Sequence, residues 1–507
     1  PAPYSRMRTS HPTETKKHMS IPIRVHRLQF GVRQVPMRLP FRFGAVTLTA
    51  AAQIHLFADI ETSTGRRAQG VAADMLAPKW FDKDPNKSYA DNMNDLIDSA
   101  KAASAAVEAV DEARPVFDLW RIGYDAAQAW GEGRGLNELT SAYGSTLVER
   151  AIIDGLGRAE GLTYYQLLRD NHLDIDLGVL HAELKGVSPG DLLAAAPRKR
   201  MQMRHTVGLL DPLCIEEVEP NQLIDDGLPQ GLDQYIAQQD LRFFKIKVGG
   251  DVDADVERLA QIAEVIALVD DAKVTLDGNE QYSDPDLLMQ LLDRLETGPD
   301  AVRQLYQKII YLEQPLDRAV CLDASLAPKI HRLSERIPMV IDEADEALDT
   351  FRLSVDRGYR GVSSKVCKGM IKALANLGLC KHFSAAKPHD YFVTGEDLTN
   401  VPLVALQQDL THLAAIDIAH VERNGHHYVR GIDHLPEAER VACRGAHRSL
   451  YDDVGEDLTS LRVVDGAMDL SSLQVPGLGI SADVELASMI PLDRWQPQDL
   501  EQIGTVA

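Results

Sequence analysis

Eight short apolar runs, each ending at a polar residue and followed by an amphipathic stretch, repeat through the middle of this chain. They are rich in β-branched residues and lie at 205–210, 243–248, 274–277, 309–313, 339–343, 362–365, 391–395 and 416–422. Eight strands that alternate with helices are typical of a (β/α)8 barrel. The structural alternative, an open doubly wound sheet, normally carries a GxGxxG turn after its first strand, and Val248-Gly-Gly lacks that spacing. We therefore predict an α/β fold of the TIM-barrel type.

The first third of the chain has a different pattern, which predicts a small α+β region before the barrel. Residues 1–18 are polar and contain no apolar stretch like that of a secretory signal, so we expect a disordered leader, with Met19 as the functional start. Alternating and helical patterns follow, and two or three antiparallel strands are expected. The predicted elements are strands at 21–28 and 45–60, a loop at 38–44, and helices at 89–113 and 145–169.

The charge balance and the cysteines exclude several classes of partner and site. The 53 Lys and Arg against 76 Asp and Glu give a formal net charge of −23, so nucleic acid and an acidic membrane surface are unfavourable partners. No run reaches the roughly twenty apolar residues that span a bilayer. The five cysteines are an odd number without CxxC spacing. We expect reduced thiols in a cytoplasmic protein, and a zinc site or a disulfide framework is disfavoured.

Ionisable residues end five successive strands, at the side of the barrel where active sites collect. Lysines end the second and sixth strands, and carboxylates end the three strands between them: Lys245, Lys247, Asp277, Glu313, Asp342, Glu343 and Lys365. Because neighbouring strands lie about 4.8 Å apart, the carboxylates can converge on one cation, and oxygen ligands favour magnesium or manganese over zinc. A substrate on that cation would have a lysine on each side. Nearby positive charge or desolvation would lower the pKa of such a lysine and prepare it as a base.

Ordered motifs at these strand ends resemble those of a known family. They are Lys245-x-Lys247, Asp277-x-Asn279, Leu312-Glu313-Gln-Pro, Asp342-Glu343 and Lys365-x-x-Lys368. Together they resemble the enolase superfamily, and within it the muconate-lactonizing subgroup of muconate cycloisomerase-like and mandelate racemase-like proteins. The likeness spans about residues 21–485, because it continues in a capping-domain loop at 40–44, a capping-domain helix at 151–159 and a C-terminal return at 476–480.

The resemblance implies a fold, a reaction and roles for the site residues. The fold is a modified (β/α)8 barrel with an α+β capping domain built from the N-terminal segment and the C-terminal tail. The reaction is magnesium-dependent removal of a proton alpha to a carboxylate, which gives a metal-stabilised enediolate. The implied metal ligands are Asp277, Glu313 and Asp342, the acid/base pair is Lys247 and Lys365, and Lys245 assists electrostatically.

Some features depart from the family pattern and leave the substrate open. Asp277 and Glu313 are 36 positions apart, a longer spacing than expected for the family, and Gly369-Met370 replaces the usual Gly-Gly. Residues 431–465 are predicted to be an inserted segment. The expected organisation is a leader at 1–18, a cap at 19–180, a barrel at 200–430, the insertion at 431–465 and a C-terminal return at 466–507.

Several residues have two interpretations. Glu343 is an alternative ligand to Asp342, which is favoured because adjacent strand residues point to opposite faces. Lys368 is interpreted as a surface charge, and the adjacent His426 and His427 as exposed polar residues of a turn. The candidate substrate-binding residues are Phe41, Arg42, Asn279 and Glu396, although Asn279 also fits a turn and Glu396 a helix N-terminus.

The expected partner is a small-molecule carboxylate, and a homo-oligomer is expected by analogy with the family. Racemisation or epimerisation and cycloisomerisation are the favoured outcomes, since lysines on both faces of the substrate suit either. Syn elimination on the same site is the alternative. It is less favoured because no histidine stands at a late strand end, as we would expect of sugar-acid dehydratases. A lysine Schiff-base aldolase, which needs no metal, and a non-catalytic barrel are the remaining hypotheses.

Overall fold

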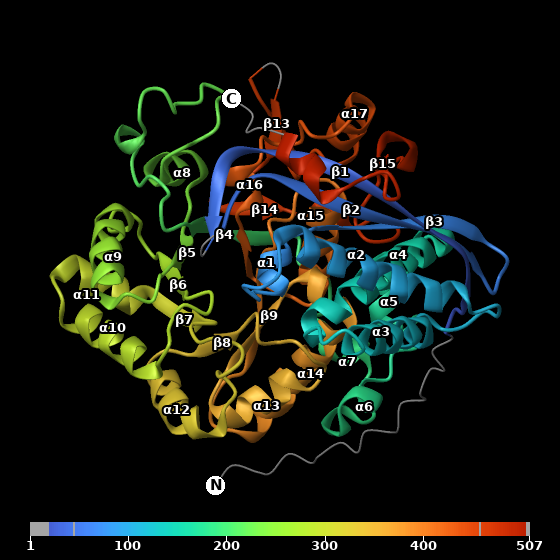
Figure 1. Ribbon diagram of the computed structural model, residues 1–507, viewed down its shortest axis with the longest axis horizontal. Helices are drawn as coiled ribbons and strands as arrows, with labels where there is room; N and C mark the ends of the chain where they lie inside the picture. The colour runs from blue at the N-terminus through green and yellow to red at the C-terminus, as the bar shows by residue number, and fades with distance from the viewer. Residues whose placement is uncertain (1–19, 44–45, 456–457, 503–507) are drawn as a thin grey trace, which may run out of the picture.

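A barrel of parallel strands forms the centre of the molecule (Figure 1). The structure is a computed structural model that describes residues 20–43, 46–455 and 458–502. Its strands, in chain order, are β4 (Arg200–Val207), β5 (Phe243–Lys247), β6 (Lys273–Asp277), β7 (Ile309–Glu313), β8 (Met339–Ile341), β9 (Gly361–Ser364), β10 (Phe392–Gly395) and β11 (His420–Arg423). Within the described residues these eight strands pair in sequence order, and β11 pairs with β4 to close the barrel. The predicted barrel is confirmed, and the open sheet is wrong.

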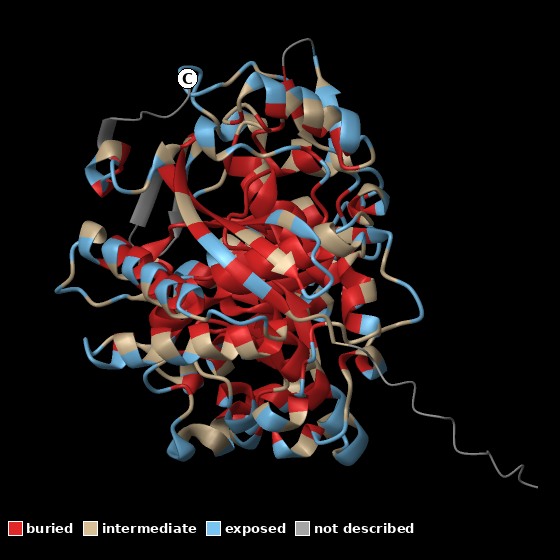
Figure 2. Ribbon diagram, turned by 90° about the vertical axis from the view of Figure 1, so that its right-hand side faces the viewer, coloured by how far each residue is buried: buried red, intermediate tan, exposed pale blue. Residues whose placement is uncertain are grey.

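Helices connect the strands and cover the outside of the barrel. Their inner faces are buried against the strands and their outer faces are exposed (Figure 2). The long spacing between Asp277 and Glu313 is occupied by α10 and α11, which Gly298-Pro299 separates. The helices are α8 (Leu232–Gln239), α9 (Val252–Ile266), α10 (Pro285–Thr297), α11 (Asp300–Lys308), α12 (Ala327–Arg336), α13 (Thr350–Arg357), α14 (Met370–Ala386) and α15 (Val404–Ala415).

An antiparallel sheet and a layer of helices form the cap (Figure 1). The strands β1 (Ile23–Phe43), β2 (Val46–Thr62) and β3 (Arg67–Met75) pair in that order, and β15 (Ile490–Pro491) from the C-terminal tail pairs with β1. The cap therefore joins the two ends of the chain, as the resemblance implies. The helices are α1 (Pro78–Phe81), α2 (Tyr89–Glu108), α3 (Val116–Glu132), α4 (Glu138–Glu160), α5 (Tyr164–Arg169), α6 (Leu177–Leu180) and α7 (Pro189–Leu192).

Local sequence explains how the helices of the cap start and pack. Asn137 begins α4 because its side chain accepts a hydrogen bond of 2.7 Å from the N–H of Thr140, one of the donors that a helix start leaves without a partner. Helix α4 then lies very close to β3. A Cβ atom at Gly70 would stand 2.0 Å from the carbonyl oxygen of Ala151, so this contact requires glycine.

Several element boundaries differ from the sequence-based expectation. The predicted loop at 38–44 is wrong over 38–43, because β1 continues to Phe43 through a register shift between Pro36 and Phe41. The first barrel strand begins at Arg200 instead of 205, since its buried Arg204 makes this run look polar. Helix α3 lies in a stretch for which no helix was predicted. The leader at 1–18 and Met19 lie outside the described residues.

Buried ion pairs join the cap to segments that project from the barrel. Residues 431–465 include α17 (Glu437–Ala446), β12 (Tyr451–Val454) and β13 (Leu458–Leu461), and β14 (Ala467–Asp469) then pairs antiparallel with β4. Arg33 of β1 binds both carboxylate oxygens of Glu439 on α17, each at 2.9 Å. Arg38, farther along β1, binds Asp226 in the connection between β4 and α8 at 2.7 Å.

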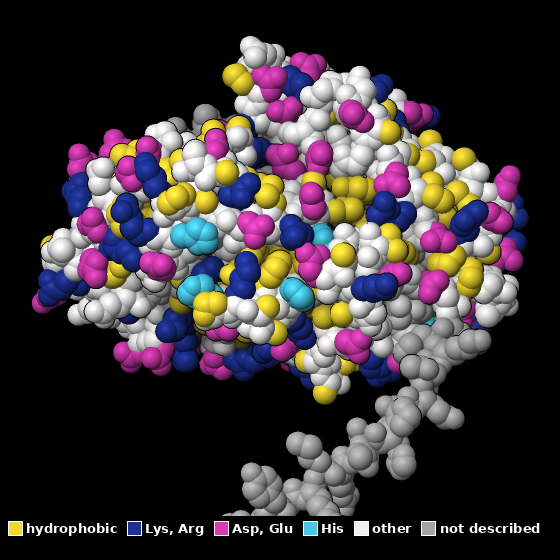
Figure 3. Space-filling view, turned by 90° about the horizontal axis from the view of Figure 1, so that it is seen from below, with side chains coloured by type: hydrophobic (Ala, Val, Ile, Leu, Met, Phe, Trp, Pro, Cys, Tyr) yellow, Lys and Arg dark blue, Asp and Glu magenta, His cyan; other side chains and the backbone are white. Residues whose placement is uncertain are grey.

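The surface carries charges of both signs. Figure 3 shows basic and acidic side chains interspersed with scattered apolar ones over one face of the molecule. In the described part of the chain, no helix combines the length and the apolar character needed to cross a membrane. The five cysteines are free thiols, as predicted.

Candidate active site

Lys245 lies at the centre of a buried group of carboxylates at the carboxyl end of the barrel. Its ammonium nitrogen is 3.0 Å from Asp277, 2.8 Å from Glu313, and 2.9 Å from both Glu396 and Glu422. Burial alone would lower the pKa of Lys245, but these carboxylates outweigh it and hold the pKa well above its ordinary value. Lys245 is therefore a fixed positive charge, which suits an electrostatic role better than that of a base.

Lys247 follows two positions along the same strand, so its side chain points to the same side of the barrel. Its ammonium nitrogen lies 2.6 Å from Oδ2 of Asp277 and donates to Oδ1 of Asn279 at 2.7 Å. Asn279 has a positive φ of 41° and also donates from Nδ2 to Glu343 at 3.1 Å. It is thus both a turn residue and a hydrogen-bonding link between the ends of β6 and β8.

Lys365 stands on the other side of the carboxylates, directly after β9. Its ammonium nitrogen lies 2.5 Å from Oδ2 of Asp342 and 4.3 Å from the ring centre of Trp80. Burial would lower the pKa of Lys365, but Asp342 overrides that effect and raises it. Because Trp80 belongs to α1, an aromatic side chain of the cap covers this lysine.

The predicted metal ligands Asp277, Glu313 and Asp342 are all buried, but they form two groups. Asp277 and Glu313 are direct neighbours in the register of β6 and β7, and both contact Lys245. Asp342 instead accepts hydrogen bonds from Lys365 and Ser363. Among the residues that the structure describes, no three Asp, Glu, His or Cys side chains stand at metal-binding spacing. In this arrangement each of the three carboxylates contacts a lysine.

The carboxylate set nevertheless fits a hard divalent cation. Oε2 of Glu313 is buried and has no hydrogen-bond partner within the described residues. Burial, together with the nearby carboxylates of Asp277 and Glu396, raises the pKa of Glu313 well above its ordinary value, because Lys245 alone does not compensate the cost of charging Glu313 there. Carboxylate oxygens of this kind are the ligands that magnesium prefers.

Asp342 and Glu343 bind different neighbours at the end of β8. Asp342 contacts Lys365, whereas Glu343 accepts from Asn279 and lies 3.7 Å from the ammonium nitrogen of Lys83. Oε2 of Glu343 is also buried without a hydrogen-bond partner in the described part of the chain. Both carboxylates are therefore candidates for the third ligand, and the preference for Asp342 stays a prediction.

Other predicted residues are placed as follows. Glu396 is fully buried next to Lys245, where Arg204 binds it and the hydroxyl of Tyr311 donates to it at 2.9 Å. The side chains of Phe41 and Arg42 lie outside the described residues. Lys368 is not a surface charge: it is buried and donates to Ser363 at 2.7 Å, because the short turn after β9 points its side chain inward.

A small cavity of about 50 Å³ lies between the barrel and the cap. It brings together Lys245, Lys247 and Lys365, and Glu422 also reaches it. Glu422 was missed by the sequence analysis, although its position in the eighth strand could have indicated it. The remaining lining residues are Met37, Ala51, Met75, Ala77, Trp80, Asn279, Asp397, Leu398, Thr399 and Asn424.

Histidines at the end of β11 pack into a buried aromatic cluster, so their predicted exposure is wrong. Nδ1 of His205 lies 3.2 Å from Nε2 of His426, and Nδ1 of His427 lies 2.7 Å from the hydroxyl of Tyr235. His427 is buried and His426 is partly buried, because α8 covers the turn that carries them. Burial lowers the pKa of His426 to about 3, so this histidine is neutral near pH 7.

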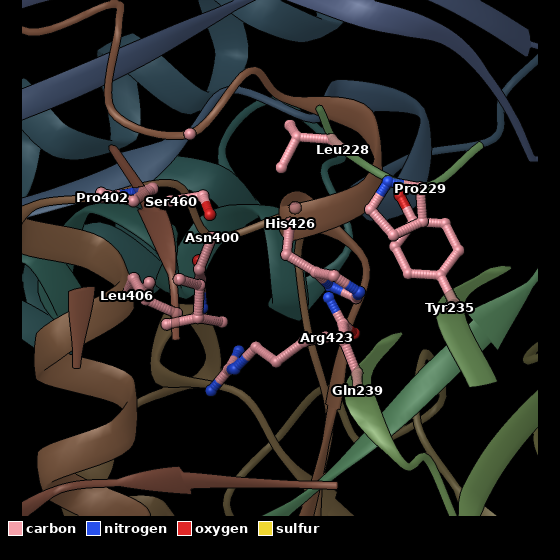
Figure 4. A pocket seen from close by; sticks show the side chains of 13 residues that line it. Leu228, Pro229, Tyr235, Gln239, Asn400, Pro402, Leu406, Arg423, His426 and Ser460 are labelled. Carbon is pink, nitrogen blue, oxygen red and sulfur yellow. The ribbon is translucent and has the colours of Figure 1, made fainter. Parts of the chain in front are cut away.

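A second cavity, of about 20 Å³, adjoins this cluster (Figure 4). Asn400, Arg423, His426 and Gln239 are among its lining residues, and each has a buried side-chain nitrogen or oxygen without a hydrogen-bond partner in the described residues. The volume and these unpaired polar atoms suit one or two ordered water molecules. None of the lysines lines this cavity, so it is separate from the candidate active site.

Comparisons with known proteins agree with this arrangement. The family model described as "Enolase C-terminal domain-like" matches residues 228–486. None of the curated proteins matches the sequence. The chain belongs to the enolase C-terminal domain-like family. It is thus an enzyme of the enolase superfamily, and the resemblance to that superfamily is confirmed.

Solved structures show the same fold over nearly the whole chain. An enolase from Bradyrhizobium "complexed with magnesium and mandelic acid" has a TM-score of 0.55 at 15% identity, covering 96% of this chain and 99% of its own. An N-succinyl Arg/Lys racemase from Bacillus cereus has the same score, identity and coverage. A muconate lactonizing enzyme from Pseudomonas fluorescens complexed with muconolactone has a TM-score of 0.53 at 14% identity, covering 91% of this chain and 97% of its own.

Proposed function

We propose that the protein catalyses magnesium-dependent removal of a proton alpha to a carboxylate, leading to racemisation or epimerisation, or to cycloisomerisation. The observation that carries this proposal is that Lys247 and Lys365, from strands on opposite sides of the buried carboxylates, line one cavity. Relatives named as racemases and lactonizing enzymes support it. Syn elimination uses the same groups and is the alternative.

The residues of the chain have distinct tasks in this proposal. Asp277, Glu313 and Asp342 would hold the ion. When bound, magnesium would supply positive charge beside the oxygen on which negative charge develops. With Asp277 and Asp342 as its ligands, Lys247 and Lys365 would no longer be paired with them, and Lys365 would lose the contact that raises its pKa. The amine of Lys247 or Lys365 takes the α-proton from one face, and the other returns a proton to the opposite face. Lys245 adds a fixed positive charge, and the cap excludes water.

The test is the wash-in of deuterium at the α-carbon of candidate carboxylates in heavy water, followed by NMR. We expect exchange with magnesium present, its loss after chelation, and its return when magnesium is added back. Product analysis separates the outcomes, because a racemate differs from the substrate in chirality, a ring-closed isomer in bond connectivity and a dehydrated acid in mass. A borohydride-trapped lysine adduct that survives chelation would contradict the proposal and support the Schiff-base aldolase.

A further inference from the structure

The cap wall of the active-site cavity is apolar. It is formed by residues of β1, β2, β3 and α1 and of the turn between β3 and α1, and all of them are buried: Met37, Ala51, Met75, Ala77 and Trp80. Leu398, from the loop after β10, adds another apolar side chain. The barrel side of the same cavity carries the lysines and the carboxylates. The two sides therefore differ sharply in polarity.

All charged side chains on the described wall of the cavity belong to the barrel. The cationic side chains that line it, Lys245, Lys247 and Lys365, all contact carboxylates already. Among the described lining residues, the cap contributes no charged side chain. An anionic group placed against this wall would lose its hydration without gaining a cationic partner, since the indole N–H of Trp80, unpaired within the described residues, is a neutral donor, and this loss is unfavourable.

The cavity is also small, about 50 Å³, and two of the cap residues on its wall are alanines. We infer that the substrate is a carboxylate whose α-carbon carries a compact apolar group, aliphatic or thioether, with no second anionic group. This inference rests on the proposed function, because the lysines and the ion fix the carboxylate at the barrel side and direct the other substituent toward the cap.

A matched panel of carboxylates tests the inference on the unmodified enzyme. Each of three series, with a 2-hydroxy, 2-amino or 2-acetylamino group, contains one member with an isobutyl side chain and one with a carboxyethyl side chain. We expect α-proton exchange with kcat/KM at least about tenfold higher for the isobutyl member of any reactive series. An equal or faster reaction of the carboxyethyl acids would overturn the inference while leaving the proposed function intact.

Binding measured without turnover distinguishes failure of the inferred substrate class from failure of the proposed reaction. If no series exchanges, thermal unfolding with magnesium and each acid becomes the readout. Greater stabilisation by the isobutyl acids would support the inferred substrate class and count against the reaction. Stabilisation by neither member would overturn both.

A pair of variants at Met75 tests the wall itself. Met75→Gln keeps the length of the side chain but adds a polar amide, whereas Met75→Leu stays apolar and is the control. We expect Met75→Gln to reduce the preference for the isobutyl acid about tenfold and Met75→Leu to change it less than about threefold. Equal preferences in both variants, with both folded by circular dichroism, would contradict an apolar subsite at this position.

Discussion

The ammonium group of Lys365 lies 4.3 Å from the centre of the Trp80 ring, so a proposed acid/base residue of the barrel is covered by an aromatic side chain of the cap. The two residues are far apart in sequence, and the contact depends on how the cap sits on the barrel. Trp80 is thus a positioning residue for Lys365, and its removal should affect the two faces of the substrate unequally.

Replacing Trp80 should therefore slow α-proton exchange from one stereoisomer of the substrate more than from the other. Because a cation–π contact contributes about 0.5–2 kcal/mol, Trp80→Ala should slow exchange of the stereoisomer that Lys365 deprotonates about tenfold, and Trp80→Phe less than about threefold. The measurement is α-proton exchange from each pure stereoisomer. An equal loss for both stereoisomers in Trp80→Ala would indicate a general structural defect instead.

The carboxylates around Lys245 should differ in metal binding. Glu313 and Glu396 both contact this ammonium group, at 2.8 and 2.9 Å, but Glu313 is a proposed ligand and Glu396 is not. We expect Glu313→Gln to weaken manganese binding at least about 100-fold, and the matched Glu396→Gln less than about fivefold. Calorimetric titration measures both. Equal weakening would show that the pocket charge, and not ligation by Glu313, governs affinity.

The same titration identifies the third ligand. Asp342→Asn should weaken manganese binding as strongly as Glu313→Gln, whereas Glu343→Gln should retain most of it, since Asp342 is the proposed ligand. A stronger effect at Glu343 would move the assignment to that residue.

Glu149 should make stability depend on pH. Its carboxylate accepts hydrogen bonds from the N–H groups of Met370 and Ile371 at 3.1 and 2.6 Å, and burial raises its pKa from 4.5 to about 7. The folded state thus keeps a proton that the unfolded state releases. This contribution to stability is complete below pH 4.5 and is lost as the pH rises through about 7.

Glu149→Gln removes this titration while keeping the size of the side chain. Its free energy of unfolding relative to the unmodified protein should rise by about 3 kcal/mol between about pH 5 and about pH 8. Urea denaturation at both pH values gives the difference. A constant difference across that range would contradict the raised pKa.

The ion pair between Arg33 and Glu439 should stabilise the attachment of the cap. Both side chains are buried, so loss of either partner leaves an unpaired charge. Arg33→Met and Glu439→Leu should each lower the free energy of unfolding by about 3 kcal/mol, and the double variant by less than the sum. Additive losses in a double-mutant cycle, measured by urea denaturation, would show that the two side chains are not coupled.

The barrel and its strand-end charges could be predicted because both follow from local pattern. The apolar runs at β5 to β9 end at Lys247, Asp277, Glu313, Asp342 and Lys365, and parallel strands bring such ends together. The boundary of β4 could not be predicted well, because a barrel strand with an interior Arg204 lacks the usual apolar run. The loop predicted at 38–44 is wrong over 38–43, because a register shift between Pro36 and Phe41 lets β1 continue through that stretch.

The cap wall could not be predicted because its residues have no pattern of their own. Met37, Ala51, Met75 and Trp80 look like ordinary core residues in the sequence, and only the docking of the cap places them opposite the lysines. The predicted exposure of His426 and His427 is wrong for a related reason. Their burial depends on α8, which comes almost 200 positions earlier in the chain.

The most direct test of the central claim is stereospecific α-proton exchange in Lys247→Ala and Lys365→Ala, with Lys329→Ala, a lysine of α12 that pairs with Asp284 and Asp286 outside the cavity lining, as the control. Each lysine is proposed to serve one face of the substrate. In each variant, the exchange rate of one stereoisomer should therefore fall at least about 100-fold, while the rate of the other stays within about tenfold of that of the unmodified enzyme. The control should retain both. Parallel loss of both stereoisomers in each variant, or retention of both, would contradict the two-lysine account.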